Sequence, residues 1–576
     1  MLNQAAHTRV VIDALDESCQ QRNTLEWLRR ISANQSIAPN KLNVIITSRK
    51  EYDIESAFLK WMPERNVLPI RADDVNKDIS DFVHSQIQLD VRLERWRERP
   101  DVQTEIESKL IEKANGMFRW VTCQLDTLEK CFDLKDLQNA LDNLPDGLNE
   151  TYSRVLARVD ARNQEKAIAM LQLLVWAERE LTLNELVDAL AIRQVGKRLQ
   201  YDPRNKMPVP NEIVKILPGL IVLDTVTRLE RRYSESIRRR LTEPPQTFVR
   251  VFVRLAHFSV KEYLISNCVH ETFKSSLEKL NAHVAIVDMC IAHFYNSWPE
   301  SHVLSDLKDS QETDDGTRDL PYFVSYLQYW PEHAQIAQAD DSALKRIFEV
   351  LTSGSASDSL FARFIQLTDP SPGHEIEDTT ALFYASVCGL DRVVSRLLES
   401  DAQAIDSPNT YDRFTALDAA TMSCSGEIVR TLLANGATPV MNTVPGVREA
   451  HSNETVVALR VLKMLLDHGA KPTHGALVDA VISKNLPMIQ FLLDNGAPTS
   501  VDNEPSLFMT LGGSTVLHHA CILGDIDIVR LLLDYGADIN ALNEERETAL
   551  DVTVDSAMKD FLLERGADVT ASSERK

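Results

Sequence analysis

A hydrophobic pattern with a helical period recurs through the last third of the chain. In Ile526–Leu533, apolar residues recur at helical spacing and predict one buried stripe along a helix. Such stretches end in Leu-Leu, two variable residues and then Gly-Ala. A glycine just beyond a helix end fits the left-handed conformation that other residues adopt only under strain. The pattern predicts a stack of helix pairs. The glycines, separated by 33, 27, 40 and 30 residues, are Gly436, Gly469, Gly496, Gly536 and Gly566, and a sixth copy has Asp401 instead.

The segment Thr515–Ala520 (TVLHHA) resembles the opening motif of ankyrin repeats, T-P-L-H-x-A. Weaker copies lie at 548–550, 415–417 and 380–382. Residues 373–570 are therefore expected to form an α-solenoid of about six repeats. Such a stack binds a protein ligand on its concave face. The units at 437–465 and 497–532 carry insertions or have lost motifs, which predicts an irregular surface.

His518 lies inside this motif and has two interpretations. A histidine in a repeated sequence position is a candidate for catalysis. Its place in the ankyrin motif instead predicts a side chain that braces the turn by hydrogen bonds, and we favour this structural interpretation.

Near the N-terminus, two short apolar runs flank one predicted helix. The runs are Val10–Asp13 and Val44–Arg49, and the helix is Thr24–Ser32. Continuous β-branched runs that alternate with helices predict buried parallel strands in an α/β sheet. Asp13 and Arg49 would lie at the carboxyl ends of the strands, where such sheets bind ligands. The alternative is that the acidic residues after Asp13 simply begin a helix, whose dipole favours them.

These runs also resemble the NACHT domain of fungal STAND-type signalling ATPases. The matching segments, VVIDALDES, VIITSRKEYDI, DVNKDISDFV, IEKANGMFRWV and LPDGLNETYSRV, follow the order of that family within the first 160 residues. The resemblance assigns residues 1–147 to a NACHT domain that hydrolyses ATP or GTP and self-associates. It implies that Asp13 holds Mg²⁺ through water, that Asp16 and Glu17 are catalytic and polarise the attacking water, and that Arg49 binds the nucleotide's terminal phosphate.

One departure from the family concerns the phosphate-binding loop. No segment matches G-x-x-x-x-G-K-[ST], and Gly196-Lys197 lacks the upstream glycine and strand. That loop supplies the backbone N–H groups and the lysine that hold the phosphates. We therefore expect no cofactor in this chain as it stands, although the complete family uses ATP and Mg²⁺, and we expect no ATPase activity. The corresponding hypothesis is a fragment, a misplaced start codon or a degenerate paralogue.

The sequence pattern of residues 148–268 predicts helices followed by a strand pair, which is the order of elements in a winged helix. The helix Glu165–Ala177, the N-cap Thr182 and the strands 220–227 and 248–256 carry this prediction. The segment RLAHFSVKEYL resembles the closing motif of the same module in NACHT proteins. There the histidine that matches His257 contacts the nucleotide; the alternative is a histidine satisfied within the fold. Winged helices also bind DNA.

Residues 269–372 are expected to form a helical connecting segment. LPYFVSYLQYWPEHA, at 320–334, resembles the equivalent segment of the family. Cys290 and His293 have the spacing of a metal pair, but without a second pair we interpret them as the apolar face of a helix. The polar stretch 306–318 predicts a mobile loop, and 571–576 predicts a disordered tail.

Charge and composition limit the classes of partner that we expect this chain to bind. The net charge of −23 disfavours binding to phosphate backbones. The arginine-rich stretch 228–240 is interpreted as a solvated hairpin loop, with nuclear import or nucleic-acid binding as the alternative. Eight scattered cysteines, no apolar run long enough to span a membrane and no signal peptide predict a cytoplasmic location and no membrane partner.

The sequence thus predicts a multidomain, mainly α protein. It combines a partial α/β P-loop-type sheet, a winged-helix and helical middle, and a C-terminal ankyrin solenoid. The expected function is protein binding in NACHT-type signalling, such as fungal innate immunity or heterokaryon incompatibility. A regulatory ATPase with an upstream P-loop and a nuclear, DNA-associated ankyrin protein remain the alternatives.

Overall fold

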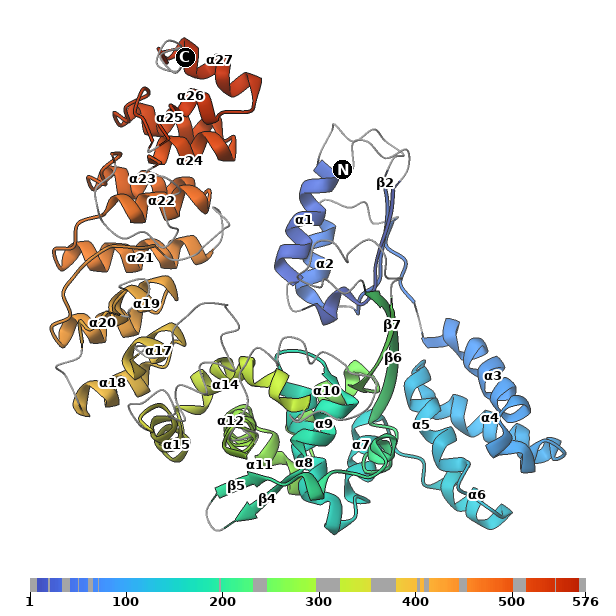
Figure 1. Ribbon diagram of the computed structural model, residues 1–576. Helices are drawn as coiled ribbons and strands as arrows, with labels where there is room; N and C mark the ends of the chain where they lie inside the picture. The colour runs from blue at the N-terminus through green and yellow to red at the C-terminus, as the bar shows by residue number, and fades with distance from the viewer. Residues whose placement is uncertain are drawn as a thin grey trace. The chain divides into compact units, whose positions relative to one another are not determined.

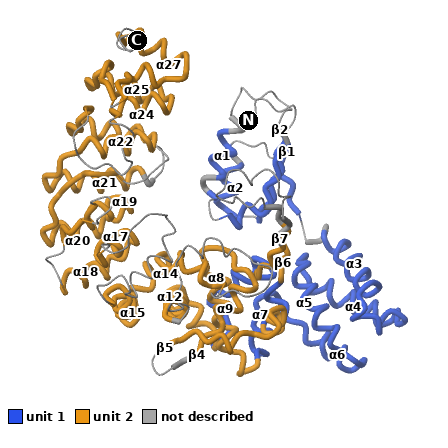
Figure 2. Tube along the Cα trace, in the orientation of Figure 1, with its two compact units in different colours: residues 1–159, 217–222, 255–271 blue, residues 160–216, 223–254, 272–576 orange. Residues whose placement is uncertain are grey.

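The computed structural model divides into two compact units (Figure 2). Unit 1 contains residues 1–159, 217–222 and 255–271, and unit 2 contains the remainder. The described residues are 8–18, 21–33, 42–49, 51–60, 66–70, 72–195, 198–230, 246–296, 322–353, 380–400, 405–408, 414–444, 453–500, 514–543 and 545–568.

Unit 1 begins with a parallel strand pair. Strand β1 (Thr8–Ile12) pairs with β2 (Leu42–Ile46) from Thr8↔Leu42 to Ile12↔Ile46, and α1 (Gln21–Ala33) connects them. The predicted parallel strands and the helix between them are therefore confirmed. The expected burial is wrong, because Val11 is 68% and Ile45 is 63% exposed. Within the described residues this sheet has two strands, so part of its apolar surface is left uncovered.

The rest of unit 1 is helical. After α2 (Tyr52–Leu59) come the helices around a common apolar core, in which Ile79, Val83 and Ile87 repeat every fourth residue. Trp120 is fully buried in that core and donates its indole N–H to the Pro145 carbonyl at 3.2 Å. The elements around this core are α3 (Ala72–Leu89), η4 (Val91–Trp96), α4 (Pro100–Ala114), α5 (Phe118–Leu128), α6 (Leu134–Asp142) and the start of α7 (Leu148–Ala157). Unit 1 also contains α10 (Phe258–Ile265).

The first part of unit 2 contains the predicted strand pair and a third strand that the sequence did not reveal. The sheet order is β3-β7-β6, and a separate hairpin joins β4 to β5. Thr182 caps α9 as predicted, because it exchanges hydrogen bonds with Glu185. The elements are η5 (Ala161–Asn163), α8 (Gln164–Trp176), β3 (Leu181–Thr182), α9 (Leu183–Ala189), β4 (Ile192–Val195), β5 (Arg198–Tyr201), η6 (Pro203–Asn205), η7 (Pro210–Lys215), β6 (Ile221–Glu230) and β7 (Gln246–Leu255).

The segment that follows is helical wherever it is described. Its elements are α11 (Glu271–Leu277), α12 (Lys279–Asn296), η8 (Tyr322–Tyr329), α14 (Trp330–Ala337) and α15 (Asp341–Leu351). Cys290 and His293 are buried on α12, and the His293 ring lies 4.6 Å from the Tyr201 ring. Burial lowers the pKa of His293 to about 3. The interpretation of this pair as core residues is therefore confirmed.

Helix pairs then follow one another from α17 to α27 (Figure 1). They are α17 (Ala381–Val387) with α18 (Asp391–Ser400), α19 (Ala416–Met422) with α20 (Gly426–Ala434), α22 (His474–Ile482) with α23 (Leu486–Asp494), α24 (Val516–Leu523) with α25 (Ile526–Asp534), and α26 (Ala549–Val552) with α27 (Ser556–Glu564). Of the two units expected to be degraded, the one at 437–465 contributes one described helix, α21 (Asn453–Asp467), whereas α24 and α25 begin within 497–532.

Several expectations fall outside the described residues. They concern most of the arginine-rich stretch 228–240, Gly196-Lys197, the loop 306–318 and the tail 571–576. Among the helices that the structure does describe, none is both long and apolar enough to cross a membrane.

Candidate functional site

The Gly-Ala motif forms the same turn in every copy. Its alanine N–H donates to the carbonyl of the residue five positions earlier, and all five of these bonds measure 3.0 Å. The preceding glycine has a φ between 84° and 95°, which a side chain would strain. The bonds are Ala437→Leu432, Ala470→Leu465, Ala497→Leu492, Ala537→Leu532 and Ala567→Leu562. The repeated sequence motif is therefore a repeated helix end.

The first helix of each described pair begins at a capping position. In α24 the cap is made by Thr515 and His518: the His518 Nδ1 lies 2.8 Å from Thr515 Oγ1, and its Nε2 lies 2.9 Å from the Glu547 carbonyl oxygen. His518 is fully buried. His518 therefore connects the start of α24 to the segment just before α26 in the next repeat. Its predicted structural role is confirmed.

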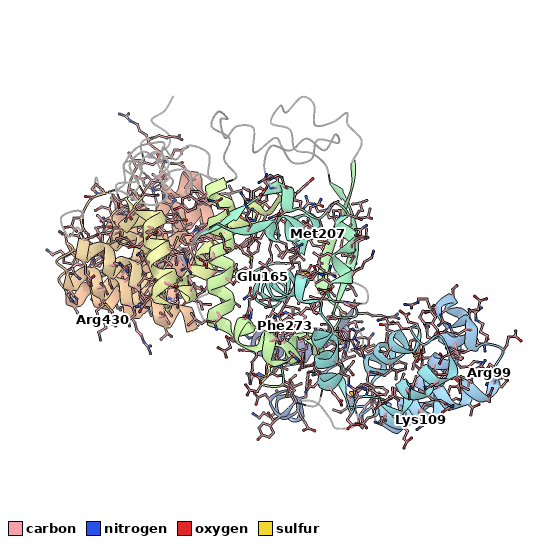
Figure 3. All side chains as sticks on the ribbon, turned by 90° about the horizontal axis from the view of Figure 1, so that it is seen from below. Arg99, Lys109, Glu165, Met207, Phe273 and Arg430 are labelled. Carbon is pink, nitrogen blue, oxygen red and sulfur yellow. The ribbon has the colours of Figure 1, made fainter. Side chains whose placement is uncertain are left out.

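Hydrogen bonds also join neighbouring repeats at the residue after Gly-Ala. Thr438 donates its backbone N–H to Asp406 at 2.9 Å, and Asp568 donates the equivalent N–H to Asn540 at 2.8 Å. The second helices carry exposed charged residues, such as Arg430 on α20 (Figure 3). The array thus offers a hydrogen-bonded scaffold with exposed charged side chains, and surfaces of such stacks bind other proteins.

A second candidate site lies in unit 1, around Arg49. Asp16 accepts two bonds from Arg49, from the backbone N–H at 2.9 Å and from Nε at 2.9 Å. Glu262 on α10 accepts from Nη1 at 2.8 Å and 2.9 Å, and the guanidinium lies over the Phe258 ring at 5.4 Å. Although burial opposes ionisation of Asp16, the bonds and charge of Arg49 lower its pKa below the usual value. The bond to Glu262 raises the pKa of Arg49.

The other predicted residues lie less close to Arg49. Glu17 is 3.9 Å from Arg49 Nη2, while Asp13 accepts a hydrogen bond from the Thr47 hydroxyl. His257 caps α10, where its Nδ1 accepts the backbone N–H of Ser259 at 3.0 Å. Burial and the charge of Arg119 lower the pKa of His257, so the ring is neutral at pH 7.

Sequence reasoning missed Glu262, Phe258 and Thr47. Phe258 and Glu262 are four residues apart and therefore share one face of α10. That spacing is visible in the sequence, but a pairing between Arg49 and Glu262, 213 positions apart, is not.

The resemblance implies a nucleotide and Mg²⁺ at this site, and the side chains do not fit them. Arg49 already binds the Asp16 and Glu262 carboxylates, so its guanidinium is not free for a phosphate. In the part of the chain that the structure describes, no three His, Cys, Asp or Glu side chains are grouped to hold a metal ion. We therefore derive no step through a nucleotide.

Comparison with known proteins supports the ankyrin assignment. A family model described as "Ankyrin repeats (3 copies)" matches residues 477–573. The C-terminal region is thus an ankyrin-repeat region, as expected, while the NACHT assignment rests on the resemblance alone.

Two curated relatives match different shares of the chain. The azaphilone pigments biosynthesis cluster protein L of Monascus ruber is 25% identical over 326 residues, which cover 52% of this chain and 62% of that protein. Protein phosphatase 1 regulatory subunit 27 of Mus musculus is 34% identical over 104 residues, 18% of this chain and 62% of that protein. The chain therefore spans less than two thirds of either relative.

Solved ankyrin domains also resemble part of the chain. The human ASB11 ankyrin repeat domain is 21% identical with a TM-score of 0.26, and the match covers 38% of this chain and 98% of that domain. The ankyrin repeat domain of Bcl-3 is 23% identical with a TM-score of 0.23, over 38% of this chain and 96% of that domain.

Proposed function

We propose that this protein is a protein-binding sensor whose ankyrin array recognises a protein ligand. The observation that carries the proposal is the repeated hydrogen-bonded helix end in five successive repeats, together with the bonds that join neighbouring repeats, such as Thr438 to Asp406 and Asp568 to Asn540. A stack of this kind presents a preformed surface, so little conformational entropy is lost on binding. The similarity to a phosphatase regulatory subunit of the mouse supports a regulatory rather than a catalytic use of the repeats.

The finer part of the proposal concerns the N-terminal regions. We assign residues 1–147 to a NACHT-type domain, 148–268 to a winged-helix-like domain and 269–372 to the helical connector, in a signalling protein of fungal STAND type. Similarity to a Monascus ruber protein supports a fungal relationship. In this assignment the Arg49 cluster holds the NACHT region to α10 through ion pairs.

Site-specific photo-crosslinking tests the binding function. A photoreactive residue is placed at Ile522 of the array, which is 61% exposed, or at Phe132 of unit 1, which is 79% exposed. In extract of a filamentous fungus, we expect saturable protein adducts from position 522 and none from position 132. Equal, non-saturating labelling at both positions would contradict array binding.

The alternative function, a regulatory ATPase, makes a separate prediction. Titration calorimetry of the chain with ATP and Mg²⁺ distinguishes the two, and we expect no Mg²⁺-dependent binding at micromolar concentration. Binding in that range, lost in Asp13→Ala, would favour the ATPase over a sensor that works by protein contacts alone.

A further inference from the structure

Two neighbouring turns of the array carry apolar side chains at the same two positions. The turn between α22 and α23 has Lys484 in the left-handed conformation, and the turn between α24 and α25 has Gly524 there. Two positions before these residues stand Ile482 and Ile522. Two positions after them stand Leu486 and Ile526. We call these four side chains the apolar patch.

The apolar patch lies on adjacent repeats. Helices α22 and α24 pack against each other, and Lys484 Nζ donates to the Leu523 carbonyl at 3.1 Å, which joins the two turns. Ile522 is 61% and Leu486 is 40% exposed, while Ile482 and Ile526 are half-buried.

Stacking of the helices does not require these apolar residues. The core contacts of the same repeats are made by fully buried side chains such as Leu492 and Leu532. The equivalent turns after α17 and α19 have Asp391 and Gly426 where the patch has Leu486 and Ile526. The structure describes four turns of this kind. In two of them, an apolar residue stands both two positions before and two positions after the left-handed residue.

The charge beside the apolar patch indicates the kind of partner. Residues 514–568 contain 12 acidic and 4 basic residues, so this short segment carries −8 of the chain's net charge of −23. Asp525 and Asp527 flank Ile526 in this segment, whereas Lys484 Nζ already donates to the Leu523 carbonyl. A partner that covers the patch therefore meets carboxylates, which attract basic side chains and repel acidic ones.

We infer that the apolar patch binds a partner segment whose apolar side chains are flanked by lysine or arginine. This inference rests on the proposed binding function of the array and names the chemistry of its ligand. The apolar side chains of the partner cover Ile522 and Leu486, and its basic side chains pair with Asp525 and Asp527, which flank Ile526. Burial of one large apolar side chain corresponds to about tenfold or more in affinity.

Three synthetic peptides test the inference on the full chain by fluorescence anisotropy. One is a 16-residue peptide of leucine and lysine, the second replaces lysine by glutamate, and the third replaces leucine by serine. We expect the leucine–lysine peptide to bind at least about tenfold more tightly than either of the others. Equal binding of the leucine–lysine and serine–lysine peptides would show attraction by charge alone and would overturn the inference.

Matched variants locate the binding. Ile522→Ser and Leu486→Ser remove exposed side chains, so they leave the core intact. Each should lower the affinity for the leucine–lysine peptide about tenfold. Phe132→Ser in unit 1 is the control and should change nothing. Unchanged binding in Ile522→Ser would overturn the inference. So would a concentration-dependent dimer in sedimentation that Ile522→Ser abolishes, because a second copy would then occupy the patch.

The outcomes also separate this inference from the proposed function. Saturable crosslinked adducts at position 522 in fungal extract, combined with no preference among the three peptides, would retain protein binding and reject the chemistry inferred for the partner. Absence of both would reject protein binding as well.

Discussion

Asp479 accepts a hydrogen bond from the Thr443 hydroxyl at 2.9 Å, inside the ankyrin array. Asp479 is only 2% exposed, and its second carboxylate oxygen has no hydrogen-bond partner. Asp479 stands three residues after Ala476, the first residue of an Ala-Leu pair in α22. At the equivalent position, α19 has Ala419 after its Ala-Leu pair, and α24 has His519 after its Val-Leu pair. Burial raises the pKa of Asp479 to about 7, against the opposing effect of the bonds from Thr443 and the Val444 backbone.

We expect Asp479→Asn to stabilise the array above pH 7. The pKa of Asp479 is about 7 in the folded protein and 3.8 ordinarily. The protonated carboxyl therefore contributes its full stabilisation below about pH 4. It is lost as the pH rises through 7, where the carboxylate is buried with a charge. Asparagine keeps the acceptor oxygen without the charge. The gain should be about 2 to 4 kcal/mol at pH 8 and near zero at pH 4.

Thermal unfolding and hydrogen exchange in α22, compared at pH 5 and pH 8, measure this gain. Asp467→Asn, at the exposed end of α21, is the matched control and should show no such pH dependence. A gain that is the same at both pH values would mean that charge burial is not the cause.

Gly536→Ala should destabilise the last repeats by about 1 kcal/mol. Gly536 has a φ of 84°, and a Cβ added there meets no atom within 4 Å, so backbone strain is the whole cost. Gly426→Ala provides the control, because Gly426 lies in α20 without a positive φ, and its Cβ would meet Val461 at an ordinary 3.7 Å. We expect Gly426→Ala to be neutral or stabilising in the same thermal measurement. Equal losses in both variants would contradict the strain argument.

The array was predictable from the sequence because its signals are local. The Leu-Leu and Gly-Ala residues that define a repeat lie within six positions, and the turn they form is closed by a bond between Leu532 and Ala537 of the same segment. A strained glycine and a helical apolar stripe are properties of one short stretch of chain. They are therefore readable without knowledge of the neighbouring repeats.

The site in unit 1 was only partly predictable, because it depends on distant contacts. The runs after Val10 and Val44 correctly predicted parallel strands, but their burial depends on what covers the sheet, and Val11 and Ile45 are exposed. Arg49 was expected to bind a phosphate. That role stays a prediction. The structure pairs Arg49 with Glu262, and no local pattern in the sequence relates Glu262 on α10 to the end of β2.

His518→Ala should destabilise the array by about 1 to 2 kcal/mol. The substitution removes the side-chain bonds to Thr515 and to the Glu547 carbonyl, which then keeps only its bond from the Asn543 N–H. His468→Ala is the control, since His468 is exposed just beyond the end of α21 and its Nδ1 bonds to the Met464 carbonyl of that helix. Urea unfolding followed by circular dichroism measures both variants. A loss in His468→Ala as large as that in His518→Ala would argue against the capping role.

Arg49→Ala should destabilise unit 1 more than Glu262→Gln. The Asp16 side chain is 3% exposed and loses its guanidinium partner in Arg49→Ala, which costs about 2 kcal/mol. The Glu262 side chain is 42% exposed, so its ion pair is screened by water, and Glu262→Gln should cost about 0.5 kcal/mol or less.

The pH dependence of Arg49→Ala provides a second readout. Because Arg49 holds the pKa of Asp16 below its usual value, the wild-type pair stabilises unit 1 above about pH 4, and this contribution is lost as the pH falls further. Arg49→Ala should therefore differ from the wild type at pH 7 and approach it at pH 3, in thermal unfolding of the full chain. Arg30→Ala, which breaks an exposed ion pair with Glu26 on α1, controls for the loss of a surface charge. If Arg30→Ala lowered the stability at pH 7 as much as Arg49→Ala, the loss would come from removal of a surface charge and not from the pair between Asp16 and Arg49.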